Sequence, residues 1–202
     1  MKSLLAVPWL YDLAQYVMRG TRYRKILAET HLKVASGDRV LDIGCGTGAM
    51  LECLPETVPP VEYVGFDMSP NYLAAARKTY GGRGEFYPLE LTPRTVADFG
   101  KFDRVLAIGL VHHLDDAAAI NLFTLAQRAL RHGGKMITLD GVFTDSQSRL
   151  VKRLLQSDRG QHVRSESAYR ALAHTAFPHV QTFVSDDLFR IPYTTLIMEC
   201  TP

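Results

Sequence analysis

The sequence predicts an α/β fold. We expect a doubly wound sheet of seven strands, mostly parallel with one antiparallel strand near the C-terminus, and helices on both faces. Apolar runs typical of strands alternate with helical stretches five times along the chain, and such crossovers are right-handed. One run, Val40–Ile43, enters a turn with glycine at 44, 46 and 48. The last two predicted strands are joined by a segment too short for a crossover helix, so they should pair antiparallel.

Composition favours one globular domain that handles a small molecule. The chain has 202 residues, of which 47% are apolar and 22% charged, and a formal net charge of +2. Without a lysine/arginine-rich run, this charge gives little reason to expect a nucleic-acid or anionic membrane partner. Three cysteines without a C-x-x-C pair argue against a disulfide framework and a structural zinc site, and fit a reducing cytoplasm. The N-terminus resembles neither a signal peptide nor a membrane span.

Residues 1–33 read as an N-terminal helical cover. Apolar residues recur at helical spacing from Trp9 to Val17, and a second helical stretch runs from Arg22 to about His31. Such a cover can offer Tyr11, Tyr16 or Arg19 to a ligand; alternatively, the tyrosines belong to the core and the arginine is solvated.

The glycine turn after the first predicted strand is the candidate ligand site. Glycine tolerates positive φ and has no Cβ, so bare backbone can approach a bound molecule. The spacing is G-x-G-x-G, with Asp42 before the first glycine, and not the G-x-G-x-x-G of dinucleotide-binding proteins. These departures favour a nucleoside with an amino-acid tail over a pyrophosphate.

A second strand-to-helix unit follows. Val61–Phe66 is the strand, Ser69 is a good N-cap, and Pro70 is a good first residue of a helix that runs to about Tyr80. Asp67 lies about twenty residues past the glycine turn, where an acid can bind ribose hydroxyls bidentately. Its alternative role is to stabilise the N-terminus of the next helix.

The third and fourth strands end beside the same site. After a strand over 83–87, Glu90 or the backbone of Leu91 is positioned to accept a hydrogen bond from an exocyclic amine, although Glu90 is equally suited to be a solvated loop charge. The apolar run Phe102–Gly109 predicts a strand buried on both faces. His112 and His113 follow it, beside the presumed reacting centre, in either a catalytic or a structural role.

The remainder completes the sheet and adds helices. Asp115–Asp116 can cap a helix over about 117–131, and no partner acid or amide at ligand spacing suggests a metal site there. A fifth strand, 135–139, ends at Asp140. A basic amphipathic helix over about 145–156 and a helix capped by Ser165 precede the two final strands, 180–185 and 193–200.

Four stretches in this order resemble the successive motifs of class I S-adenosylmethionine-dependent methyltransferases: VLDIGCGTGAML, YVGFDMSPNYL, FDRVLAIGLVHHLDD and HGGKMITLD. The resemblance implies a Rossmann-like seven-stranded sheet with a terminal antiparallel hairpin, and S-adenosyl-L-methionine as cofactor. It also implies that Asp42, Gly44, Cys45 and Gly46 surround the methionine part of the cofactor, that Asp67 holds the ribose, and that Met68 packs on adenine. Near Glu90 and Leu91 the family more often has an aspartate.

By the same resemblance, residues 34–140 form a cofactor-binding core, 141–178 a helical region that determines acceptor specificity, and 179–202 a C-terminal hairpin. With the N-terminal cover, the acceptor side includes Tyr11, His112, Asp140, His162 and Arg164. The stretch DRGQHVR suits an anionic or carboxylated acceptor. His162 and Arg164 are equally suited to be a polar link between two helices.

The leading hypothesis is methyl transfer to a small-molecule acceptor at oxygen, nitrogen or carbon. For a hydroxyl or amine acceptor, His112 or His113 would be the general base. A nicotinamide dehydrogenase and a non-catalytic S-adenosylmethionine-binding module are the alternatives. A nucleic-acid methyltransferase would have an N-P-P-aromatic motif where this chain has Gly109–His112, and a basic face. The sequence is compatible with a monomer or a homodimer.

Overall fold

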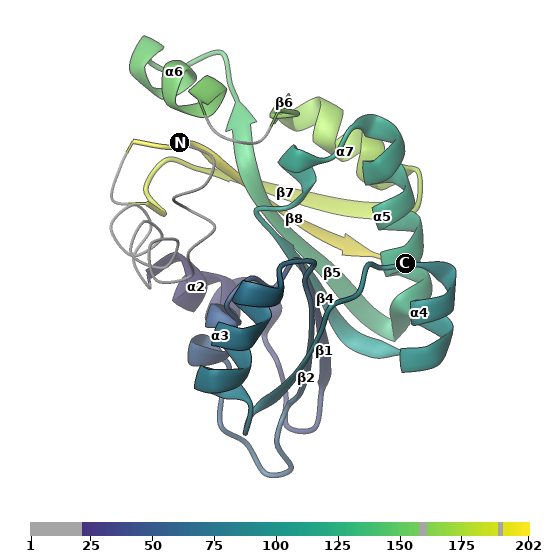
Figure 1. The fold of residues 1–202 in the computed structure, drawn as a ribbon. Coiled ribbons are helices and arrows are strands. Elements are labelled where there is room, and N and C mark those ends of the chain that lie inside the picture. The colour runs from purple at the N-terminus through teal and green to yellow at the C-terminus, as the bar shows by residue number, and fades with distance from the viewer. Residues whose placement is uncertain (1–21, 158–160, 190–191) are drawn as a thin grey trace.

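A computed structural model describes residues 22–157, 161–189 and 192–202 (Figure 1). Most of the predicted N-terminal cover, with Tyr11, lies outside these ranges. The described elements are α2 Arg22–Ile26, η2 Leu27–Leu32, β1 Arg39–Ile43, η3 Ala49–Cys53, β2 Glu62–Phe66, α3 Pro70–Tyr80, β3 Gly84–Tyr87, α4 Pro93–Phe99, β4 Phe102–Ile108, η4 Val111–His113, α5 Asp116–Ala129, β5 Leu130–Phe143, α6 Arg149–Ser157, β6 Arg164–Ser165, α7 Glu166–His174, β7 His179–Ser185 and β8 Thr195–Thr201.

The sheet confirms the predicted topology. Seven strands follow the order β3-β2-β1-β4-β5-β8-β7, and β8 pairs antiparallel with both β5 and β7 while the other pairs on this path are parallel. The short strand β6 pairs parallel with β5 off this path and makes an eighth strand. In Figure 1 the strands form a twisted layer with α5 and α7 on one side and α2 and α3 on the other.

The central strands are buried on both faces, as their continuous apolar runs predict. Along β4, Val105 and Ala107 belong to the core cluster under α5 and α7, whereas Leu106 belongs to the cluster under α2, η3 and α3. Successive side chains of a strand point to opposite faces, so one run of apolar residues supplies two cores.

Local end signals explain several helix boundaries. Helix α3 spans the predicted residues, and the Ser69 hydroxyl accepts a hydrogen bond from the Tyr72 N–H at 3.4 Å. Helix α5 begins after Asp115, whose carboxylate accepts from the Ala118 N–H at 2.8 Å. These contacts satisfy N–H groups that a helix leaves without an internal partner.

Other boundaries differ from the sequence prediction. Helix α4 was not expected, and α6 begins at Arg149 and not near residue 145. Helix α5 ends at Ala129 and β5 begins at the next residue, so the predicted helix end near residue 131 and the predicted strand start at residue 135 both lie within β5. There the register between β4 and β5 shifts, because Phe102 pairs with Leu130 and Arg104 with Lys135.

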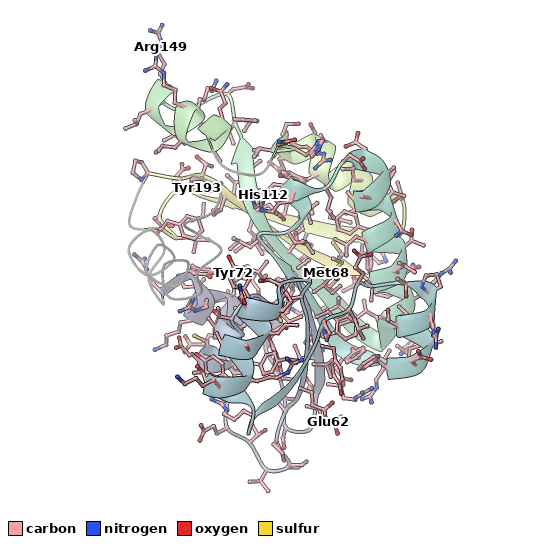
Figure 2. All side chains as sticks on the ribbon, viewed as in Figure 1. Glu62, Met68, Tyr72, His112, Arg149 and Tyr193 are labelled. Carbon is pink, nitrogen blue, oxygen red and sulfur yellow. The ribbon has the colours of Figure 1, made fainter. Side chains whose placement is uncertain are left out.

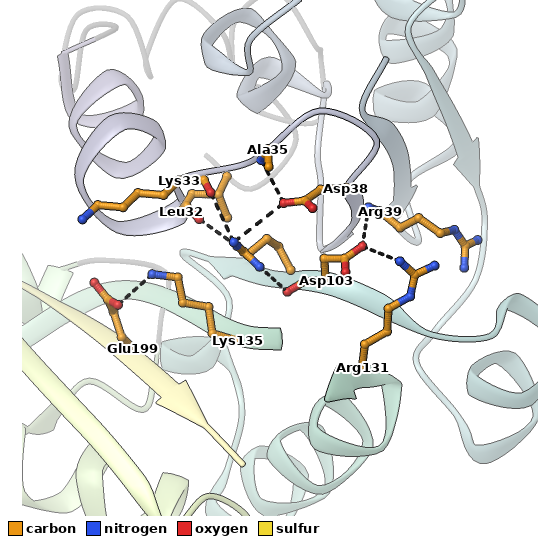
Figure 3. A network of polar contacts seen from close by, with 10 residues as sticks. Leu32, Lys33, Ala35, Asp38, Arg39, Asp103, Arg131, Lys135 and Glu199 are labelled. Atoms are coloured by element: carbon orange, nitrogen blue, oxygen red, sulfur yellow. Dashed lines mark hydrogen bonds and ion pairs between the residues drawn. The ribbon is translucent and has the colours of Figure 1, made fainter. Parts of the chain in front are cut away.

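A polar network at the amino end of β4 holds the helices that precede β1 (Figure 3). Helix η2 is a π-helix, and its C-cap Lys33 has φ 48°. Arg104 donates to the carbonyl oxygens of Leu32 at 2.8 Å and Lys33 at 3.2 Å, and lies 3.7 Å from the Asp38 carboxylate. Asp103 accepts from the Arg39 N–H at 2.8 Å. Carbonyls at a helix end need such partners, so the network fixes the helical layer against the sheet.

Candidate functional site

The candidate site lies at the carboxyl edge of the sheet, where the strand order reverses. β1 pairs with β2 on one side and with β4 on the other, and the chain continues outward in both directions. In open α/β sheets, ligands bind outside the strand ends at this switch point. Figure 2 shows Glu62 at one end of β2 and Met68 just past the other, toward the middle of the molecule.

The glycine turn uses its own N–H groups to hold its shape. Gly44, Gly46 and Gly48 have φ of 73°, 56° and 76°. The N–H groups of Gly44 and Cys45 donate to the Phe66 carbonyl at 2.8 and 3.0 Å, and that of Gly48 donates to the Cys45 carbonyl at 3.0 Å. Pyrophosphate recognition by a glycine loop needs N–H groups aimed at the ligand. In this turn these N–H groups already donate to protein carbonyl oxygens, which argues against a dinucleotide ligand.

Two glycines at the turn allow close packing. A Cβ on Gly48 would lie 2.9 Å from the Phe86 ring, and one on Gly65 would lie 2.7 Å from the Cys45 Sγ. The Cys45 thiol thus packs over β2, and its burial raises its pKa. We therefore expect the backbone of Cys45, and not its thiol, to face a ligand.

Asp67 joins the glycine turn to helix α3. One carboxylate oxygen accepts from the Gly46 N–H at 2.9 Å, and the other accepts from the Ser69 N–H at 2.8 Å. An ionised carboxylate has about four lone-pair sites, so each oxygen retains the capacity for a ligand hydroxyl. The next residue, Met68, is 59% exposed and presents an apolar side chain beside the Asp67 carboxylate.

Asp42 lies beneath the turn, where it is 2% exposed. Its carboxyl accepts a hydrogen bond from the Tyr63 hydroxyl at 2.6 Å. Burial in the core disfavours the charged form and raises the pKa of Asp42 to about 7, although the Tyr63 bond opposes the rise. Sequence reasoning missed this pair, because nothing local links residue 63 to residue 42.

The loop after β3 is anchored through its backbone. The Thr95 hydroxyl donates to the Glu90 carbonyl at 3.0 Å, and Thr95 forms a reciprocal capping box with Thr92 at the start of α4. The Glu90 side chain is exposed, whereas Leu91 is half-buried against the core. The Thr92–Pro93 pair repeats the Ser69–Pro70 signal and indicates α4 in the sequence.

His112 and Asp140 form a buried pair between the ends of β4 and β5. The same Asp140 oxygen, Oδ1, accepts from the His112 N–H at 3.1 Å and from His112 Nδ1 at 2.8 Å. Both residues are 2% exposed. Because the carboxylate only accepts, it fixes the proton on Nδ1 and leaves Nε2 as the lone-pair nitrogen of the neutral ring. Asp140 Oδ2 is buried without a hydrogen-bond partner among the described residues.

The two neighbouring histidines differ in burial. His113 is exposed, and its ring centroid lies 4.2 Å from that of His112. His112 is the buried one of the two, and its ring is held by the Asp140 carboxylate.

Arg164 ties the segment before α7 to the loop after β4. Its Nε and Nη2 donate to Asp116 Oδ1 at 2.9 and 2.7 Å. Its remaining N–H groups donate to the carbonyls of Val111, Leu114 and His162. These bonds use all five donors of the guanidinium, so an anionic ligand would have to displace one of them. This geometry is the polar link that the sequence allowed as the alternative role.

His162 adjoins the His112–Asp140 pair, since its N–H donates to the His112 carbonyl at 3.0 Å. The described part of the chain thus brings His112, Asp140, His162 and Arg164 together, and separately gathers the glycine turn, Asp67 and Met68. Within the same part, no group of three His, Cys, Asp or Glu side chains is arranged to hold a metal ion. No described helix has the length and apolar character needed to cross a bilayer.

Comparison with known proteins gives a consistent result. A family model described as a methyltransferase domain matches residues 40–134. The chain is 28% identical over 143 residues to the ubiquinone/menaquinone biosynthesis C-methyltransferase UbiE of Desulfotalea psychrophila, covering 69% of this chain and 56% of the relative. It is 34% identical over 109 residues to a ubiquinone biosynthesis O-methyltransferase of Bradyrhizobium, covering 52% and 41%.

The fold also matches solved structures. Human N-acetylserotonin methyltransferase in complex with SAM has a TM-score of 0.66 at 16% identity, covering 91% of this chain and 52% of that chain. At 16% identity, this structural similarity establishes the shared fold alone. The chain spans about half the length of each of these three proteins.

The Asp42–Tyr63 pair predicts a pH-dependent stability. The ordinary pKa of Asp42 is 3.8 and its folded-state pKa is about 7, so the folded state binds more protons between these values. Its contribution to the unfolding free energy therefore decreases from about pH 4 to pH 7 and levels off above that. Asp42→Asn cannot ionise. Relative to the wild type, it should gain on the order of 4 kcal/mol between pH 4 and pH 8, at about 1.4 kcal/mol for each pKa unit.

Chemical denaturation at both pH values measures this difference. Asp98→Asn on the exposed side of α4 is the matched control and should show a much smaller change with pH. A stability difference between Asp42→Asn and wild type that stays constant from pH 4 to pH 8 would refute the assignment.

Proposed function

We propose that the chain is a class I S-adenosylmethionine-dependent methyltransferase, which transfers the methyl group of S-adenosylmethionine to a small-molecule acceptor. The observation that carries the proposal is the Asp67 carboxylate. It lies at the carboxyl edge of the sheet, bonded to the Gly46 and Ser69 N–H groups and with lone pairs remaining for two ribose hydroxyls.

The surroundings of Asp67 fit this cofactor. The exposed Met68 supplies an apolar surface for adenine, and the loop at Glu90 and Leu91 supplies acceptors for its amine. The backbone from Gly44 to Gly46 would hold the methionine part, with Asp42 supporting the turn from below. When bound, the sulfonium supplies a methyl group already activated for transfer.

The protein's own contribution is orientation and proton removal. Holding two reactants in line can supply roughly 7–11 kcal/mol of a barrier. For a hydroxyl or amine acceptor, His112 is the better base than the exposed His113, because Asp140 fixes its tautomer and stabilises the imidazolium that forms. A carbon acid or an already ionised acceptor needs no base, and the pair then shapes the pocket.

The acceptor side comprises residues 141–178 and the N-terminal segment that includes Tyr11. Asp140, at the end of β5, and His162 both contact His112, whereas Arg164 contributes through hydrogen bonds to neighbouring carbonyl oxygens. The matched relatives include a C-methyltransferase and an O-methyltransferase, so they support a small molecule and leave the methylated atom open. The cysteines form no disulfide in the structure, consistent with a reducing cytoplasm.

Substitution of Asp67 tests the cofactor site. Asp67→Asn should weaken binding of S-adenosylhomocysteine about 10- to 100-fold, because hydrogen bonds to a charged group contribute roughly 1.5–3 kcal/mol. Asp67→Ala should weaken it further. Isothermal titration calorimetry measures the affinity, and Glu62→Gln, at the opposite end of β2, is the control with the same change in charge. Unaltered affinity in Asp67→Ala would contradict the proposed site.

Substitution of His112 tests the acceptor side separately. With a hydroxyl or amine acceptor, His112→Ala should lower kcat about 10²–10⁴-fold while S-adenosylhomocysteine affinity stays near that of the wild type. The assay follows labelled methyl groups from S-adenosylmethionine into a small-molecule cell extract. Full transfer by His112→Ala would exclude the base role. Absence of transfer by the wild type, despite tight cofactor binding, would favour the non-catalytic module.

A further inference from the structure

Helix α6 carries an unbalanced positive charge. It contains Arg149, Lys152 and Arg153 and no acidic residue. None of the three cations forms an ion pair with any residue that the structure describes. On α4, by contrast, Arg94 lies 3.6 Å from the carboxylate of Asp98 on the same helix. The small net charge of +2 for the whole chain therefore does not reveal that positive charge is concentrated on this helix.

The same helix exposes an apolar side chain beside these cations. Leu150 is 60% exposed, and Leu154, one turn later on the same side, is half-buried. The opposite stripe is tied to the protein, since Val151 is 9% exposed and Leu155 is fully buried. The outer flank of α6 thus combines the exposed Leu150 with the exposed Arg149 and Arg153, whereas Lys152 is half-buried toward the other side of the helix.

The fold presents this flank at an extremity of the molecule. Figure 1 shows α6 standing beyond the end of β5 and apart from the sheet, and Figure 2 shows Arg149 extending outward from its tip. Leu155 anchors the helix against Gly141, where an added Cβ would lie 2.7 Å from its Cδ2.

We propose that α6 docks on the surface of an anionic phospholipid bilayer. Arg149 and Arg153 meet the lipid headgroups beside Leu150, which enters the boundary between headgroups and acyl chains, and Lys152 adds to the positive charge of the helix. Nucleic acid would also attract the cations, but an exposed leucine makes no favourable contact with a phosphate backbone. Three positive charges within about two helical turns would also neutralise only a few phosphates. Because α6 follows β5, the bilayer lies on the acceptor side of the molecule, near Asp140.

Vesicle co-sedimentation tests this surface. The full chain should bind vesicles of phosphatidylcholine with phosphatidylglycerol, bind pure phosphatidylcholine at least about tenfold more weakly, and be released by high salt. The triple variant Arg149→Gln/Lys152→Gln/Arg153→Gln should lose about 10²-fold in partitioning, since each Lys or Arg near such a surface contributes roughly fivefold. Leu150→Ser should reduce binding without changing the charge.

The matched control is Lys78→Gln/Arg94→Gln/Arg170→Gln, which removes the same charge from α3, α4 and α7 and should retain vesicle binding. Thermal unfolding of each variant should stay near that of the wild type, because the changed side chains are at the surface. Equal losses in the two triple variants, equal binding to neutral vesicles, or no binding by the wild type would overturn the proposal. So would an α6-dependent affinity for a nucleic-acid oligonucleotide in place of vesicles.

Discussion

The carboxylate of Asp67 is the interaction on which the site depends. It bonds to the Gly46 N–H on one side and to the Ser69 N–H on the other, and so fixes the turn after β1 relative to the start of α3. The parallel pairing of β1 with β2 brings these segments to one edge, and the positive φ angles of the turn let its backbone stay close to β2. A charge placed there is well suited to recognise hydroxyl groups, because its oxygens accept more bonds than the protein uses.

A second polar centre lies at the ends of β4 and β5. Asp140 holds His112 through backbone and ring, and the carbonyl of His112 in turn accepts from the His162 N–H. Arg164 fastens the same loop through carbonyl oxygens and Asp116. Burial makes these contacts strong and leaves little freedom in the ring, which is the preorganisation that a base requires. The two centres lie on opposite sides of the strand switch point, and we propose the first for the methyl donor and the second for the acceptor.

Local signals in the sequence were enough to predict much of this arrangement. Ser69 and Pro70 predicted the start of α3 because capping involves only neighbouring residues, and the short connection before β8 predicted its antiparallel pairing. Thr92 and Pro93 carry the same local signal at the start of α4. Contacts between distant residues could not be predicted in this way. The Asp42–Tyr63 pair and the full engagement of Arg164 depend on how strands and loops come together in space. The different burial of His112 and His113 depends on the direction of one short turn.

The central claim is that the glycine turn and Asp67 form the binding site for the nucleoside of S-adenosylmethionine. A crystal structure of the protein with S-adenosylhomocysteine tests it most directly. We expect both ribose hydroxyls to lie within hydrogen-bond distance of the Asp67 carboxylate. Adenine should pack against Met68, and the amino-acid tail should lie beside Gly44–Gly46. Ribose bound away from Asp67, or a ligand seated at another edge of the sheet, would contradict it.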